Sequence, residues 1–138
     1  DPMNCWKCRE NRKCEVMCAA IGENGIAQFQ VDLDDRGLSG LERVPENRQS
    51  IWTPVVFLYD AMVRTLDDPK VDLLSIDTEG TEIEVWRGIG NIRPNIVIME
   101  YNTLGKPSNE VAVVNEMEAC GYRVVWKNAL NLIFTHGQ

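Results

Sequence analysis

Two continuous apolar runs dominate the hydrophobic pattern of the chain. Residues 71–77 and 95–101 consist mainly of Val, Ile, Leu and Met, and each run ends with an acidic residue, Asp77 in the first and Glu100 in the second. Such runs are typical of strands buried on both faces of a parallel sheet. They predict that the chain has a parallel sheet at its centre.

Helical and hairpin patterns surround these two runs. A helix that buries Ile83, Trp86 and Ile89, spaced by three, is predicted to begin directly after Asp77 and to end near Gly90, and a second helix is predicted over 108–121. Only two residues separate the runs at 122–127 and 130–135, which is too short for a crossover. The two runs must therefore form an antiparallel hairpin. This alternation predicts an α/β fold in which a parallel sheet ends in an antiparallel hairpin.

The first half of the chain has a weaker pattern of polar stretches and short alternations. Its predicted elements are, in order, a helix over 3–12, a buried strand over 14–18, a half-buried antiparallel strand over 27–33, a loop over 34–53, a short strand over 55–57 and a helix over 58–66. A loop as long as 34–53 is expected only where it acts as a lid or a binding loop.

Composition and charge narrow the classes of function. The 138 residues are 44% hydrophobic and 25% charged, as expected for one globular domain, and the net charge of −7 argues against nucleic acid or an anionic membrane as a partner. No apolar run approaches the roughly 20 residues of a membrane span. A cytoplasmic location is the resulting expectation. Asp1 stands where an initiator Met is expected, so we expect a processed, trimmed or partial piece.

Five cysteines exclude a fully paired disulfide framework. Cys5, Cys8, Cys14 and Cys18 lie close together, and their spacing leaves a zinc site or a redox pair as alternatives. The gaps are short for structural zinc, however, and the strand–helix context of a redox motif is absent. We therefore expect reduced thiols and no metal site.

The segment after the first apolar run carries a family resemblance. Residues 72–88 read Asp-Leu-Leu-Ser-Ile-Asp-Thr-Glu-Gly-Thr-Glu-Ile-Glu-Val-Trp-Arg-Gly, and Arg93-Pro94 leads into the run that ends at Glu100. This arrangement resembles the FkbM family of S-adenosylmethionine-dependent methyltransferases, and residues 16–22 and 52–60 resemble further parts of it. The resemblance implies a Rossmann-like class I methyltransferase sheet with the strand order 3-2-1-4-5-7-6.

The resemblance extends to the C-terminal two-thirds of the family's domain. No Gly-x-Gly pattern precedes residue 22, so the first two strands of the implied sheet and the turn that cradles the cofactor are missing. We expect residues 1–138 to be a partial methyltransferase domain, either a partial gene product or a degenerate copy. Its two open sheet edges would favour a homodimer, and its cofactor affinity is expected to be weak or absent.

Acidic side chains at the ends of the two apolar runs are the candidate catalytic residues. Ligands of open α/β sheets bind at the carboxyl ends of the strands, where Asp77, Glu79 and Glu100 are expected. A carboxylate there can orient an acceptor hydroxyl or take its proton. The alternative is that Asp77 caps the following helix and that Glu79 complements its dipole. Glu82 and Glu84 are expected to be solvated charges on that helix.

Further site residues follow from the resemblance. It implies cofactor contacts by Asp1, Ala20, Ile21 and Asp77, and acceptor contacts by Arg36, Ser39, Tyr101 and Asn102. Tyr101 and Asn102 have the alternative of merely beginning a loop. The single histidine, His136, is expected at the surface, so no Ser–His or Cys–His hydrolase is predicted.

The function predicted from these residues is O-methylation of a hydroxyl on a small molecule or sugar, with S-adenosylmethionine as the methyl donor and no metal. Two alternatives remain at this point. One is a non-catalytic methyltransferase remnant that acts as a dimerising or binding module. The other is a Mg²⁺-dependent transferase that uses Asp77, Glu79 and Glu100 as ligands.

Overall fold

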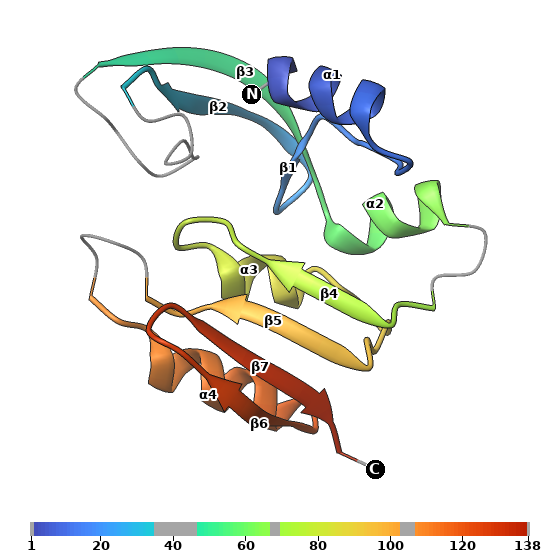
Figure 1. The fold of residues 1–138 in the computed structure, drawn as a ribbon, viewed down its shortest axis with the longest axis vertical. Coiled ribbons are helices and arrows are strands. Elements are labelled where there is room, and N and C mark those ends of the chain that lie inside the picture. Colours follow the sequence, from blue (N-terminus) through green and yellow to red (C-terminus); the bar gives the residue numbers. More distant parts are fainter. Residues whose placement is uncertain (1, 35–46, 67–69, 103–106, 138) are drawn as a thin grey trace. The chain divides into compact units, whose positions relative to one another are not determined.

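The structure is a computed structural model that describes residues 2–34, 47–66, 70–102 and 107–137 (Figure 1). The chain divides into two compact units, Asp1–Asp67 and Asp68–Gln138, and each is described here by itself. Helices and strands are mixed in both, with a sheet in each, which confirms the predicted α/β class.

The first unit is built around a small sheet with the strand order β1-β3-β2. Strands β2 and β3 pair antiparallel from Gly25↔Val55 to Asp32↔Arg48, and β1 pairs parallel with the end of β3. The elements of this unit are α1 (Pro2–Asn11), β1 (Ala20–Ile21), β2 (Gly25–Asp32), β3 (Arg48–Val56) and α2 (Leu58–Thr65).

The prediction of a loop over 34–53 is wrong for residues 48–53, which belong to β3. In this strand Ile51, Thr53 and Val55 are more buried than Trp52 and Pro54, which is the alternation of a half-buried strand. In the sequence, Pro54 argues against a strand at this position. It is tolerated because β1 pairs only with the two residues that follow it, so Pro54 is not flanked by strands on both sides.

The buried strand predicted over 14–18 is also absent, because these residues have no regular structure and Cys14 and Cys18 are exposed. Cys8 is half-buried, and the Cys5 side chain lies outside what the structure describes. Within the described residues, no group of three or more His, Cys, Asp or Glu side chains is placed to hold a metal ion. The zinc alternative therefore gains no support.

The second unit holds a four-stranded sheet with the order β4-β5-β7-β6. Strands β4 and β5 are parallel, whereas β7 is antiparallel to both β5 and β6, so the predicted hairpin after a parallel pair is confirmed (Figure 1). Its elements are β4 (Leu73–Ile76), α3 (Glu82–Arg87), β5 (Ile96–Glu100), α4 (Glu110–Ala119), β6 (Tyr122–Lys127) and β7 (Asn131–His136).

One face of this sheet carries the core of the second unit. Val97 and Met99 of β5 alternate along the strand, and Phe134 and Leu132 of β7 are their register partners, so the four side chains share a face and are buried. Trp86 of α3 packs edge-on against another strand residue of the unit, Tyr122 of β6, with ring centroids 5.2 Å apart. This packing fixes α3, and with it the segment that connects β4 to the helix.

Two details of the prediction for this unit are wrong. Strand β4 is not buried on both faces, because Leu73, which is 54% exposed, and Ser75 lie exposed on one face, whereas Ile76 is buried on the other. The helix after Asp77 begins at Glu82 rather than directly after the strand. Residues 77–81 are therefore a loop between β4 and α3, called the 77–81 loop below.

Within the described parts of the chain, no helix combines the length and apolar character needed to cross a membrane.

Candidate functional site

Asp77 and Glu100 lie at equivalent positions on neighbouring strands. The last register pair of the parallel strands β4 and β5 is Ile76↔Met99, and the two acidic residues follow directly. Asp77 is exposed, whereas Glu100 is only 9% exposed. The structure thus brings both residues to the carboxyl ends of two adjacent parallel strands, as predicted. This pair is called the acidic edge below.

The structure tests the alternative that Asp77 caps the following helix. The N-cap of α3 is Thr81, which makes no capping hydrogen bond with its side chain, and Asp77 lies outside the helix in the 77–81 loop. Asp77 therefore does not cap α3, and that alternative is wrong.

Glu79 also lies outside the helix, in contrast to the first-turn position that was expected. Its backbone has a φ of 60°, in the left-handed region, and it is followed by Gly80 with a φ of 118°. A residue with a side chain is uncommon in that region and costs about 1–2 kcal/mol there. The surrounding contacts must hold the 77–81 loop in this conformation.

Glu82 supplies these contacts, although the sequence predicted a solvated charge. Its side chain is 1% exposed, and its Oε1 atom accepts hydrogen bonds from the Thr78 amide at 3.0 Å, the Thr78 hydroxyl at 3.1 Å and the Gly80 amide at 2.9 Å. The prediction for Glu82 is wrong because the carboxylate replaces water with donors from the loop. Glu84, on the same helix, is exposed as expected.

The hydrophobic pattern of this segment contains a signal for the burial of Glu82. The buried positions of the segment are Glu82, Val85, Trp86 and Ile89, which is the i, i+3, i+4, i+7 stripe of an amphipathic helix. The prediction instead took Ile83 as the first buried position, although this residue is only half-buried. A carboxylate on an otherwise apolar stripe indicates a buried polar contact.

Tyr101 and Asn102 follow the acidic edge but bond to the turn between β6 and β7. The Tyr101 hydroxyl donates to the carbonyl of Asn128 at 2.8 Å, and the Asn102 side chain donates to the carbonyl of Ala129 at 3.0 Å. The Tyr101 amide donates to the carbonyl of Leu130 as well. The side chains of both residues thus donate hydrogen bonds within the fold. Contact of either residue with a methyl acceptor stays a prediction.

The remaining predicted site residues are distributed over the chain. Ala20 and Ile21 are half-buried residues of β1 and belong to the first unit, whereas Asp77 belongs to the second. Asp1, Arg36 and Ser39 lie outside the described residues. Their roles stay predictions.

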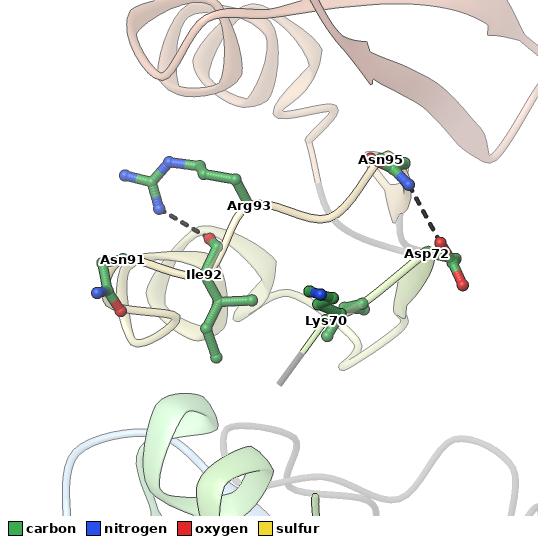
Figure 2. A pocket seen from close by; sticks show the side chains of 7 residues that line it. Lys70, Asp72, Asn91, Ile92, Arg93 and Asn95 are labelled. Carbon is green, nitrogen blue, oxygen red and sulfur yellow. Dashed lines mark hydrogen bonds between the residues drawn. The ribbon is translucent and has the colours of Figure 1, made fainter. Parts of the chain in front are cut away.

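A polar cavity of about 410 Å³ lies at the other end of the sheet, before the first residues of β4 and β5 (Figure 2). There Asn95 donates to the Asp72 carboxylate at 3.1 Å, and the Arg93 guanidinium donates to the carbonyls of Ile92 and Gly90, both at 2.8 Å. The cavity is lined by Lys70, Val71, Asp72, Asn91, Ile92, Arg93 and Asn95. None of these residues was predicted for the site.

A second hollow of about 550 Å³ is lined by Asn95, Arg123, Thr135 and His136. It shares Asn95 with the first, so both lie away from the acidic edge. His136 is exposed as expected, but its ring packs edge-on against Tyr122 with centroids 4.9 Å apart.

Two ion pairs shift the pKa values of residues on α3, α4 and β6. Arg87 donates to Glu116 at 2.7 Å, and this hydrogen bond lowers the pKa of the Glu116 carboxyl. Lys127 donates to both carboxylate oxygens of Glu110 at 2.7 Å, which raises the pKa of the lysine. These pairs join helices to each other or to the hairpin, and they include neither residue of the acidic edge.

Comparison with known proteins gives one match. The family model described as "Methyltransferase FkbM domain" matches residues 7–124, which is most of the chain. No curated protein and no solved structure matches the chain.

Proposed function

Because the chain belongs to the FkbM methyltransferase domain family, we propose that it serves S-adenosylmethionine-dependent methylation of a hydroxyl on a small molecule or sugar. The observation that carries this proposal is the acidic edge, in which Asp77 and Glu100 end adjacent parallel strands. The carboxyl ends of parallel strands are where open α/β sheets bind ligands.

The residues of the acidic edge fit a cofactor that is both cationic and rich in hydroxyls. Asp77 is exposed and outside the helix, so its carboxylate is available to accept hydrogen bonds or to face a positive charge. Bound S-adenosylmethionine supplies a methyl group on a sulfonium, and transfer of that methyl to a hydroxyl oxygen leaves a neutral thioether and releases the hydroxyl proton.

The chain's own residues would hold the acceptor and manage that proton. Asp77 would accept the hydrogen bond of the acceptor hydroxyl, orient its oxygen and take its proton as the new C–O bond forms. Glu100, which is largely buried at the equivalent position of β5, would provide a second negative charge at the same edge. Positioning and a base are sufficient, because the methyl group of a sulfonium is already activated.

The experiment is a titration of the 138-residue chain with S-adenosylmethionine, followed through backbone amide resonances. This method detects the weak binding that the sequence predicts, up to millimolar ligand. We expect the amides of the 77–81 loop and of Glu100 to shift and to saturate. Replacing Asp77→Asn removes a charged acceptor, which is worth about 1.5–3 kcal/mol, so the affinity should fall about 10- to 100-fold.

Asp72→Asn is the matched control, because it makes the same change of charge at the opposite end of β4. It should leave the affinity unchanged. The proposal fails if no resonance of the acidic edge responds to ligand, or if Asp72→Asn weakens binding as much as Asp77→Asn.

The titration also distinguishes the two other functions. A non-catalytic remnant that pairs through the outer edge of β4 would dimerise with increasing protein concentration and ignore the ligand. A Mg²⁺-dependent transferase would respond to Mg²⁺ instead, but the described residues contain no group of three metal-binding side chains. The cytoplasmic location and the homodimer stay predictions from the sequence.

A further inference from the structure

We propose that Glu82 is the positioning residue of the site, which holds the 77–81 loop in the conformation that places Asp77 at the acidic edge. The expected effect of Glu82 on ligand binding rests on the proposed function, because it concerns the same acidic edge. Its physical basis is separate and lies in the contacts of a single carboxylate oxygen.

The hydrogen bonds of Glu82 fix the loop at two backbone positions. The Thr78 amide immediately follows Asp77, and the Gly80 amide immediately follows Glu79. Both donate to the same Oε1 atom, at 3.0 and 2.9 Å, so the backbone must curve around the carboxylate. The position of Asp77 relative to β4 is therefore set by a residue of the following helix, through the two amides of the loop.

The loop needs such an anchor because of its backbone conformation. Glu79 has a φ of 60°, a conformation that a residue with a side chain rarely adopts. The hydrogen bonds from the Thr78 and Gly80 amides to the Glu82 carboxylate offset the cost of this conformation.

Core stability alone does not explain a glutamate at position 82. It occupies the buried stripe of α3 together with Val85 and Trp86, where an apolar side chain would pack without desolvating a charge. Its second oxygen, Oε2, is buried and has no hydrogen-bond partner among the described residues. The contacts that the carboxylate does make are all directed at the 77–81 loop, as a positioning role requires.

The test compares Glu82→Leu with the nearly isosteric Glu82→Gln in the full 138-residue chain. The first readout is hydrogen exchange and the proton shift of the Thr78 and Gly80 amides. In Glu82→Leu both amides should lose protection roughly 10- to 100-fold, because each loses a charged acceptor. Glu82→Gln keeps the acceptor oxygen, so it should restore most of the protection while the amide proton shifts change with the loss of charge.

The second readout is the affinity for S-adenosylmethionine, measured with the same amide titration. It should fall at least about tenfold in Glu82→Leu and recover in part in Glu82→Gln. Glu84→Gln, which changes an exposed carboxylate on the same helix, is the matched control and should change neither readout.

The outcomes separate the two proposals. The inference is overturned if the Thr78 and Gly80 amides in Glu82→Leu keep their protection and shifts, or if they lose them without any loss of affinity. It is also overturned if Glu84→Gln has the same effect. If the unmodified chain does not bind the ligand at all, the proposed function fails, while the two amides still decide whether Glu82 holds the loop.

Discussion

Replacing Gly80→Ala is expected to disturb the acidic edge more than its size suggests. Gly80 has a φ of 118°, which side chains rarely tolerate, and its amide donates to Glu82. Holding a residue with a side chain in a sparsely populated backbone region costs about 1–3 kcal/mol. Loss of backbone freedom in the unfolded chain offsets about 0.4–1 kcal/mol of this cost. The net loss of unfolding free energy should therefore lie between about zero and about 2.6 kcal/mol.

The assay is guanidinium-induced unfolding of the variant, combined with the S-adenosylmethionine titration. If the loop instead moves to relieve the strain, the stability loss will be smaller, but the amide bond to Glu82 is lost and affinity should fall. Gly90→Ala is the matched control, because Gly90 also has a positive φ, of 67°, but lies beyond α3. After the same offset, it should lower the unfolding free energy by no more than about 1.6 kcal/mol and leave affinity unchanged. A Gly80→Ala chain with normal stability and normal affinity would contradict the description of the loop.

Two further predictions concern stability. Tyr122→Phe should cost about 1–3 kcal/mol at pH 7, because the hydroxyl of this residue, itself only 2% exposed, donates to the Pro94 carbonyl at 2.8 Å. Burial raises the pKa of Tyr122 above 10.0, so the native chain should lose more stability than the variant as the pH rises above 10; parallel alkaline unfolding curves would contradict this. Glu116→Gln should lower the melting temperature slightly at pH 7, since the hydrogen bond from Arg87 holds the pKa of Glu116 below 4.5. That stabilisation is present above pH 4.5 and is lost as the pH falls through the lowered pKa, so the two chains should converge in acid; a constant difference in melting temperature would argue against the ion pair.

The second unit could be predicted from the sequence because its signals are local and strong. The runs at 71–77 and 95–101 and the short turn before residue 130 leave few arrangements, and the structure has the order β4-β5-β7-β6. A short strand was predicted over 55–57, but the first part of β3 was missed, because Pro54 and the polar residues of 48–53 hide an alternation that becomes clear only when β2 pairs with it. Pairing between distant segments is not encoded in a local pattern.

The site was predicted in part for a similar reason. The equivalence of Asp77 and Glu100 follows from two strand ends, so the sequence was sufficient for it. The role of Glu82 depends on the path of the 77–81 loop, in which two amides turn toward a buried oxygen. A loop conformation with a positive φ at a glutamate cannot be read from residue types, since nothing in the sequence marks Glu79 as unusual.

The hydrogen bonds from residues 101 and 102 to the hairpin turn have a consequence for the surroundings of Glu100. Through them, the tip between β6 and β7 braces the backbone that directly follows Glu100. The tip lies beyond residue 124, where the match to the family model ends. Substitutions in the tip can therefore reshape the surroundings of Glu100 while the segment that matches the family model stays unchanged.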